Sequence, residues 1–204
     1  FEVAQWRIKG LQKKEDRWQA LVDIPADQRT AAQQAEYARI DGELARVPVD
    51  PRRLMPTTLG NILRSAEEYS QVRYGLVAGV CWPRLWLVLP SETQNALSAA
   101  RGQLDGAVRL FLWGALFALW TFWAWWAIVA ALAMVLIAYW AMLQAAGVYG
   151  DLLRSAFDLH RFKLYQAVRF PLPETPQDEV NQGQRLSEYL FRGTTVQEIR
   201  FIKT

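Results

Sequence analysis

The stretch from Leu110 to Leu143 contains no charged residue, and its only members outside the apolar class are Gly114 and Thr121. A run of about 18 or more apolar residues predicts a membrane span, because a helix needs about 20 of them to cross about 30 Å of hydrocarbon. Helices buried in soluble proteins have shorter apolar runs. The stretch therefore predicts an all-α integral membrane protein and constrains how the rest of the chain can fold.

The stretch could cross the membrane once or twice. As one straight helix it would be about 50 Å long, and an average tilt of about 20° absorbs only part of that excess. As a transmembrane helical hairpin over 104–146, it would turn near Thr121–Trp126 and bring tryptophans to the membrane–water interface that indole rings prefer. A single helix would leave them at the bilayer centre. We interpret four residues as interface anchors and expect three of the four to lie close to this turn: Trp120, Trp123, Trp125 and Trp126.

Basic residues flank the stretch on both sides. Two precede it and three follow it: Arg101, Arg109, Arg154, Arg161 and Lys163. Basic residues mark the cytoplasmic side, so both flanks are predicted to be cytoplasmic, which requires an even number of crossings. Against the hairpin, the turn lacks the Gly, Pro, Asn and Asp that usually punctuate turns. We favour the hairpin and keep the single span as the alternative.

Composition narrows the class of protein further. The 204 residues are 52% hydrophobic, which suits one soluble domain plus membrane segments. The net charge of +3 comes without a basic run, so nothing predicts nucleic-acid binding. Cys81 is the only cysteine, which excludes a disulfide framework within one chain. Residues 1–18 lack the apolar core of a signal peptide, and because the chain begins at Phe1 we expect further residues before it.

Residues 1–55 predict a cytoplasmic helical hairpin and a linker. Helices over 1–24 and from about Asp27 to Val47 flank Pro25, and each carries apolar residues along one face. The pattern is typical of an αα-hairpin with coiled-coil character. Three prolines between 48 and 56 prevent the second helix from continuing.

Residues 56–103 combine an amphipathic helix with a short apolar segment, Gly75–Pro90. The segment is too short to span a bilayer and a central proline interrupts it, which is typical of a re-entrant or interfacial element. In one interpretation it packs as a bent hydrophobic element or lies on the membrane surface with Trp82 and Trp86 as anchors. In the other, Arg84 faces a water-filled path or lipid phosphates, because a cation in apolar surroundings needs a partner.

Helix ends carry recognisable signals. Ser91 resembles an N-cap with Gln94 three residues later, which predicts a helix that leads into the membrane. Thr175 precedes Pro176 at a first helical position, and Gly193 is typical of a helix stop.

Residues 147–204 predict a cytoplasmic helical extension and tail. The second span continues as a helix to about Phe170, and His160, the only histidine, lies on its apolar stripe. We interpret His160 as a packed side chain, with a pH sensor as the alternative because its unperturbed pKa lies near 6.5. The tail after Gly193 suits a strand or a docking segment.

Residues 60–66 and 150–156 share five of seven identities, GNILRSA against GDLLRSA. Their surroundings do not match, so a full internal duplication is not indicated. Either the likeness is coincidental, or the two helices are pseudo-equivalent and place Arg64 and Arg154 near the membrane surface. In the second case both join Arg84 as candidate pathway or lipid-contact residues.

No constellation of catalytic residues is apparent. The sequence contains no spacing typical of a metal site and no glycine-rich phosphate loop, so we predict no metal, no cofactor and no enzyme. Small residues of the hairpin, among them Gly114, Ala115, Ala127, Ala130, Ala131, Ala133 and Ala138, offer surfaces for close helix–helix contact.

Several local motifs resemble a group of uncharacterised bacterial multi-spanning membrane proteins. They are LGNILRSAEEY (59–69), RYGL (73–76), WPRLW (82–86) and DLHRF (158–162), within a resemblance that covers about Pro56 to Pro176. The resemblance implies a bacterial integral membrane protein with cytoplasmic helical regions. It implies no activity and no functional residues.

These observations lead to two hypotheses. The first is a non-enzymatic, oligomeric membrane assembly protein of the bacterial inner membrane, acting as a channel or membrane effector. The second is a non-conducting anchor or scaffold whose cytoplasmic helices recruit a protein partner. A lipid-modifying enzyme is disfavoured by the missing catalytic set. Both favoured hypotheses predict a multi-pass protein in contact with lipids and with further copies of itself.

Overall fold

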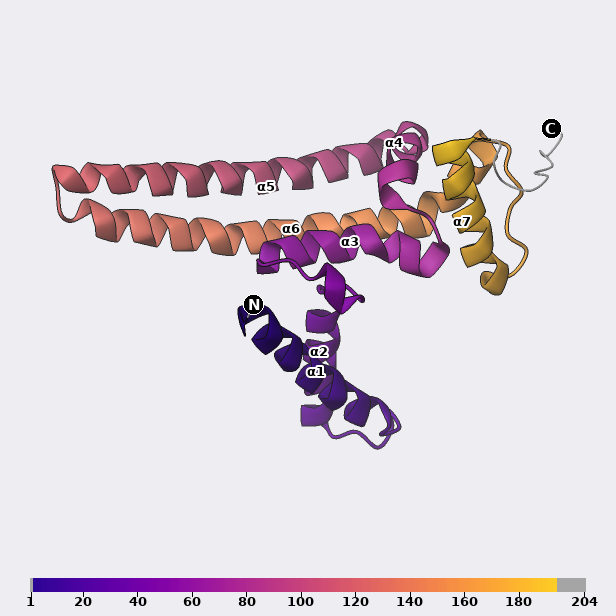
Figure 1. The fold of residues 1–204 in the computed structure, drawn as a ribbon, viewed down its shortest axis with the longest axis horizontal. Coiled ribbons are helices and arrows are strands. Elements are labelled where there is room, and N and C mark those ends of the chain that lie inside the picture. The colour runs from indigo at the N-terminus through magenta and orange to yellow at the C-terminus, as the bar shows by residue number, and fades with distance from the viewer. Residues whose placement is uncertain (1, 194–204) are drawn as a thin grey trace. The chain divides into compact units, whose positions relative to one another are not determined.

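The computed structural model describes residues 2–193, and every regular element in that part of the chain is a helix (Figure 1). The predicted all-α fold is therefore confirmed. The chain divides into two compact units, Phe1–Ser65 and Ala66–Thr204, with the boundary inside one helix. The predicted tail after Gly193 lies outside the described residues.

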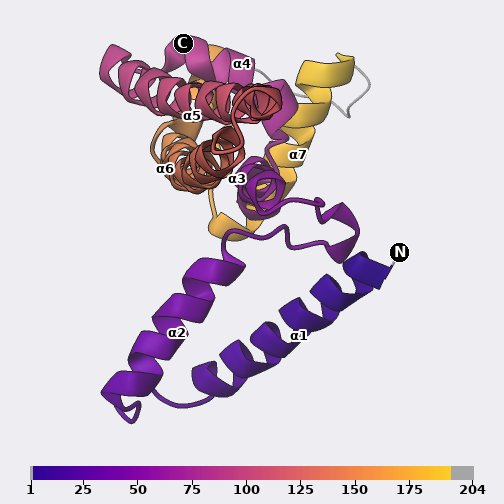
Figure 2. The same ribbon diagram turned by 90° about the vertical axis from the view of Figure 1, so that its left-hand side faces the viewer.

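The first unit contains α1 (Glu2–Val22), α2 (Ala31–Leu44) and the short 3-10 helix η1 (Pro51–Arg53). Helices α1 and α2 run antiparallel and converge at the loop between them (Figure 2). Among the side chains of α1 and α2 that the structure describes from residue 10 onward, Leu21 and Ile40 are buried apolar residues. That this unit lies in the cytoplasm stays a prediction.

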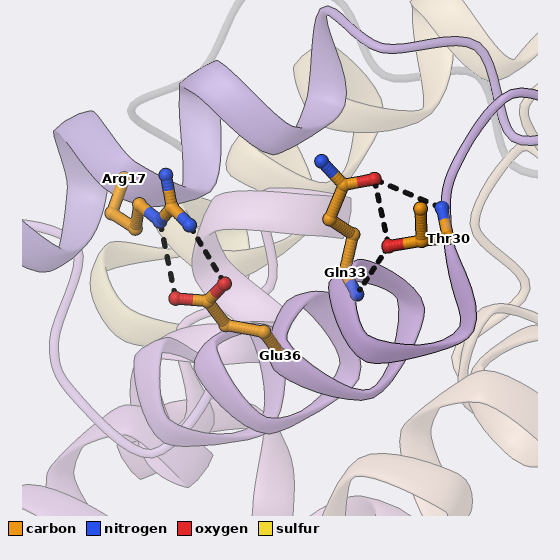
Figure 3. A network of polar contacts seen from close by, with 4 residues as sticks. All are labelled: Arg17, Thr30, Gln33 and Glu36. Carbon is orange, nitrogen blue, oxygen red and sulfur yellow. Dashed lines mark hydrogen bonds and ion pairs between the residues drawn. The ribbon is translucent and has the colours of Figure 1, made fainter.

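Helix α2 begins at Ala31, later than the predicted start near Asp27. The reason is a capping box that the sequence reading missed. The Thr30 side chain accepts a hydrogen bond from the Gln33 N–H at 3.3 Å, and the Gln33 side chain accepts the Thr30 N–H at 2.9 Å (Figure 3). These reciprocal bonds satisfy two backbone donors at the helix start.

Polar contacts hold α1 against α2. The Arg17 guanidinium donates to both carboxylate oxygens of Glu36, at 3.1 and 2.8 Å (Figure 3). The Trp18 indole N–H donates to Asp41 at 3.0 Å, and its ring stacks on Tyr37 with 6.2 Å between centroids. The Arg17–Glu36 pair is exposed to solvent, so it contributes little to stability and mainly fixes how the two helices face each other.

The uncharged stretch of the second unit folds as two antiparallel helices. Helix α5 (Ser91–Phe117) leads into the 3-10 helix η2 (Ala118–Phe122), and α6 (Ala127–Ala167) returns beside it (Figure 1). The turn falls within the predicted segment 121–126, and the single-helix alternative is wrong. Helix α5 is continuous through Gly102 and Gly106.

Small side chains line the seam between α5 and α6. The buried positions of α5 alternate at spacings of three and four residues, as in coiled-coil packing. A Cβ added at Gly114 would lie 3.1 to 3.2 Å from side-chain atoms of Met134 and Val135, so the helices approach closely there. The buried seam residues are Leu97, Ala100, Leu104, Ala107 and Gly114 on α5, and Ala127, Ala131, Ala138, Met142 and Ala145 on α6.

At the end of the hairpin away from the turn, a helical base surrounds α5 and α6. It contains the C-terminal part of α3 (Thr58–Tyr74) together with α4 (Ala78–Val88) and α7 (Pro176–Arg192) (Figure 1). Their apolar core includes these fully buried side chains: Leu76, Cys81, Leu85, Leu97, Phe157, Leu164, Tyr165, Phe170 and Leu186. The predicted start of α7 is confirmed, since the Thr175 side chain accepts the Asp178 N–H.

The predicted N-cap at Ser91 is wrong. Pro90 occupies the N-cap position of α5 without a side-chain hydrogen bond, and Ser91 is already helical. Residues Ala78–Val88 form one α-helix that contains Pro83. Proline removes one backbone donor within a helix, and α4 keeps its form through packing against α6 and α7.

Candidate membrane-facing hairpin and its polar base

Two helices are long and apolar enough to cross a membrane, Ser91–Phe122 and Ala127–Ala167. In their most apolar stretches only 11% and 22% of the residues are buried within the protein. A soluble core helix would have most of these side chains buried. The hairpin thus directs large apolar side chains outward over much of its length, among them Leu112, Trp113, Leu116, Val129, Leu132, Leu136, Ile137 and Trp140.

The tip of the hairpin is aromatic and exposed. Phe122, Trp123 and Trp125 expose 87%, 81% and 79% of their surface. Trp120 lies against Trp123 with 5.9 Å between ring centroids, and Trp126 lies 6.4 Å from Phe117. The four tryptophans predicted as anchors at the turn therefore gather at one end of the hairpin.

Polar groups at the tip are few. The Thr121 hydroxyl donates to the Ala118 carbonyl at 2.6 Å, so it is satisfied within η2. Among residues 2–193, no protein group accepts a hydrogen bond from the backbone N–H groups of Trp125 and Trp126 or from the indole N–H groups of the tip tryptophans. These donors need an acceptor from outside residues 2–193.

Trp82 and Trp86, the other predicted anchors, lie elsewhere. Both are half-buried against the core of the base. Their rings are 5.7 Å apart, and Trp82 lies 5.8 Å from Phe157. Trp82 thereby packs α4 onto α6, and Trp86 packs beside Trp82.

Arg84 is exposed on α4 and is bound to backbone carbonyls. Its guanidinium donates to Val80 at 2.6 Å within its own helix and to Leu190 at 3.3 Å. Leu190 belongs to the last turn of α7, where carbonyls lack helical partners and attract a cation. Arg84 thereby links α4 to the C-terminal end of α7.

The other two candidate arginines have different surroundings. Arg154 on α6 pairs with Asp151 at 3.0 Å, and its guanidinium lies 5.8 Å from the centre of the Tyr69 ring. Arg64 is half-buried on the part of α3 that belongs to the first unit. Arg84 thus binds backbone carbonyls of α4 and α7, whereas Arg154 pairs with a carboxylate of α6.

His160 is half-buried on α6. Its Nε2 lies 3.5 Å from the Thr93 hydroxyl of α5, and its buried Nδ1 has no hydrogen-bond partner among the residues that the structure describes. The side chain thus contacts both helices of the hairpin at the base. The hypothesis that it senses pH stays a prediction.

A polar cluster in the base was missed by sequence reasoning. Tyr74 donates to Asp158 at 2.6 Å and Tyr69 donates to the other oxygen of the same carboxylate at 3.2 Å. Arg161 pairs with Glu179 at 2.5 Å and lies 4.3 Å from the centre of the Tyr74 ring. Its guanidinium also donates to the Asp158 carbonyl. The cluster joins α3, α6 and α7.

Burial of the two phenols affects their protonation. It raises the pKa of Tyr74 and of Tyr69, and the charge and hydrogen bonding of Asp158 raise each pKa further. Both tyrosines therefore remain protonated donors to one carboxylate. Their arrangement suits a structural clamp between helices.

A second contact in the base depends on glycine. Gly75 adopts a positive φ of 71°, and a Cβ there would collide with the Val180 carbonyl. A Cβ at Gly183 would fall on the Tyr74 carbonyl oxygen. The Ser187 hydroxyl lies beside this crossing and accepts the Val77 N–H at 3.0 Å, 3.6 Å from the Cys81 thiol.

Among the described residues, no group of three or more His, Cys, Asp or Glu side chains is placed to hold a metal ion. Comparisons with protein-family models, curated proteins and solved structures find no match. The resemblance to uncharacterised bacterial membrane proteins therefore stays a prediction, as does the absence of enzymatic activity.

Proposed function

We propose that this protein is a non-enzymatic, multi-pass membrane anchor in which the α5–α6 hairpin inserts into the lipid bilayer and the remaining helices recruit a cytoplasmic protein. The observation that carries the proposal is the outward-facing apolar surface of the hairpin. Transfer of one large apolar side chain out of water contributes about 1.5 to 3 kcal/mol. Summed along the hairpin, this exceeds the net stability of about 5 to 15 kcal/mol that a typical domain has.

The orientation follows from the flanking charges. Both ends of the hairpin lie at the base, which carries Arg101, Arg154, Arg161 and Lys163. Cytoplasmic segments of membrane proteins carry an excess of basic residues, which supports a cytoplasmic position for this end of the hairpin. In a bacterial cell the corresponding location is the inner membrane.

Packing within the hairpin favours an anchor over a pore. The seam between α5 and α6 is filled by alanine, leucine, methionine and glycine, and the hydroxyl of Thr121 is bound to the backbone. Ion pathways are lined by carbonyl, hydroxyl or charged groups at depth. Between Arg109 and Gln144 a single hairpin offers no charged group, and its side-chain hydroxyls are those of Thr121 and Tyr139.

A matched pair of substitutions on α6 tests the anchor. Leu132 and Leu159 are both exposed, by 58% and 74%, but only Leu132 lies in the uncharged stretch. An arginine at the bilayer centre costs about 2.5 to 3.5 kcal/mol or more. Leu132→Arg is expected to move much of the protein from the carbonate-resistant membrane fraction to the soluble or degraded fraction, while Leu159→Arg stays integrated. Equal extraction of the two variants would contradict the proposal.

An oligomeric channel is the second candidate function. Gly114, Ala127, Ala131 and Ala138 are buried inside the hairpin, whereas Ala115 and Ala133 remain exposed and could support contact between copies. Several hairpins would then surround a hydrophobic gate. Ion flux from liposomes containing the purified oligomer distinguishes the two: the anchor predicts no flux at any pH or voltage, and flux that Arg84→Ala alters would favour the channel.

A further inference from the structure

The register of α5 against α6 determines which residues of the two helices lie at the same height along the hairpin. Gly114 lies opposite Met134 and Val135 near the middle of the apolar surface. Towards the base, the Arg101 guanidinium lies 5.8 Å from the centre of the Tyr149 ring. These two contacts between α5 and α6, one near the middle of the hairpin and one at the base, fix the register. We call two residues level when they lie at the same height along the hairpin axis.

In this antiparallel register, the polar groups that limit the apolar surface form one belt. Arg109 of α5 is level with Tyr139 and Trp140 of α6, and Asp105 is level with Gln144. Arg109 and Gln144 are exposed, and Trp140 exposes 64% of its surface. Tryptophan, tyrosine and arginine together are typical of a membrane–water interface.

The belt is close to the aromatic tip. From Trp140 to Trp126 along α6 the helix rises about 21 Å, and from Gln144 to Trp126 about 27 Å. From Arg109 through the end of α5 and through η2 to Phe122 the rise is about 22 Å. A typical bilayer has a hydrocarbon core of about 30 Å, so the apolar length of the hairpin is short by several ångströms.

A short hairpin could stop within the first leaflet, but the tip argues against it. Its indole N–H groups and the backbone N–H groups of Trp125 and Trp126 find no acceptor in the described part of the protein. Unsatisfied donors are costly in hydrocarbon, whereas lipid headgroups and water accept them at an interface. The tip therefore requires a polar layer on the far side.

We propose that the α5–α6 hairpin crosses both leaflets and fits a bilayer with a hydrocarbon core thinner than about 30 Å, with the tryptophan tip in the far interface. This inference rests on the proposed membrane anchor and adds the kind of membrane that the anchor fits. In a thicker bilayer the hairpin has to thin the lipid around it or withdraw its tip.

Cysteine accessibility in vesicles of different thickness tests the proposal. The 204-residue chain carries Ala124→Cys at the tip or Ser98→Cys at the base, and the parent chain, whose Cys81 is fully buried, gives the background. Each variant is reconstituted into phosphatidylcholine vesicles with myristoleoyl, oleoyl or erucoyl chains. A membrane-impermeant maleimide is then added outside, and detergent afterwards reveals the remaining thiols.

If the hairpin crosses both leaflets, each molecule exposes either position 124 or position 98 outside the vesicle. The fraction labelled from outside at position 124 then equals the fraction protected at position 98. The labelling rate at position 124 is expected to be on the order of tenfold higher in myristoleoyl than in erucoyl vesicles. Protection of position 124 in all three lipids, or equal rates in all three, overturns the inference while the anchor stands. Loss of the protein from every vesicle in alkaline carbonate overturns the anchor as well.

Arg109→Leu provides a second measurement. It lengthens the apolar surface of α5 towards Asp105 and is expected to raise labelling at position 124 severalfold in erucoyl vesicles. The matched control is Arg185→Leu, which removes an exposed arginine from α7 and leaves the hairpin unchanged. If the two variants label at the same rate, the polar boundary does not lie at Arg109 and the assigned thickness is overturned.

Discussion

At Gly75 and Gly183 the backbone segments of the base approach more closely than any side chain allows. A Cβ at Gly183 would fall on the Tyr74 carbonyl oxygen, so Gly183→Ala must displace α7 from the end of α3. We expect a loss of about 2 to 4 kcal/mol in the free energy of unfolding, measured by denaturation in detergent micelles. Gly106→Ala is the control, because a Cβ there meets nothing within 4 Å and alanine favours the helix by up to about 1 kcal/mol.

The two phenols that donate to Asp158 predict a loss of stability at alkaline pH. Tyrosine in an unfolded chain loses its proton near pH 10, whereas burial raises the pKa of Tyr69 and Tyr74 in the folded protein. The folded state then binds more protons, so stability is complete below about pH 10 and falls as pH rises towards the folded pKa values. Thermal unfolding midpoints measured across this range should decline less steeply in Tyr74→Phe. An unchanged slope would contradict the linkage.

The sequence predicted the positions of some single residues but not the contacts of others. The position of the tip tryptophans at the turn could be predicted, because indole rings prefer a membrane–water interface and a hairpin brings them to one end. The pairing of Tyr69 and Tyr74 with Asp158 joins residues 89 and 84 positions apart, and each phenol looks like an ordinary residue of an amphipathic helix. No local pattern signals such a contact, because it depends on how α3 packs against α6.

At the scale of elements, the seam of the hairpin makes a sharp prediction. Gly114→Leu would force a large side chain against Met134 and Val135, while Ala115→Leu adds the same side chain to the exposed face. Overpacking costs about 1 to 3 kcal/mol or more, so Gly114→Leu should separate α5 from α6. Crosslinking between cysteines placed on the two helices near the tip should fall in Gly114→Leu only. Equal crosslinking in both variants would show that the seam tolerates bulk.

The hairpin itself was predictable from charge and tryptophan placement, although its turn lacks the usual turn residues. The structure explains how the chain reverses without them. Helix η2 tightens the end of α5, and the N–H groups of Trp123 and Ala124 both donate to the Trp120 carbonyl. The residue types in the turn therefore predicted the chain reversal less well than the length of the apolar stretch and the positions of its tryptophans.

Helix starts were predicted with mixed success for a physical reason. Thr175 is followed by a proline that cannot donate, so the N-cap has one consistent position. At Ser91 the preceding Pro90 takes that position instead, and the apparent capping pattern is not used. A capping sequence therefore identifies the N-cap only when the preceding residue is not itself suited to the N-cap position.

At the scale of the whole molecule, the two units have separate apolar cores. Leu21 and Ile40 are buried in the first unit, whereas the core cluster around Phe157 and Tyr165 consists of residues from Ala66 onward. Neither the division inside α3 nor the core membership could be inferred from the sequence, since α3 reads as one continuous amphipathic helix. Separate cores suit an anchor whose partner-binding part can change without releasing the membrane part.

This separation predicts that damage to one core stays local. Leu21 is 1% exposed, and Leu21→Ala should cost the first unit about 2 to 5 kcal/mol through lost burial and a residual cavity. Hydrogen exchange followed by mass spectrometry should accelerate in peptides from α1 and α2 and remain unchanged in peptides from α6 and α7. Phe157→Ala should give the reverse pattern, because Phe157 is fully buried in the second core. If Leu21→Ala also accelerates exchange around Phe157, the two cores unfold together, and changes in the recruiting part would then reach the membrane anchor.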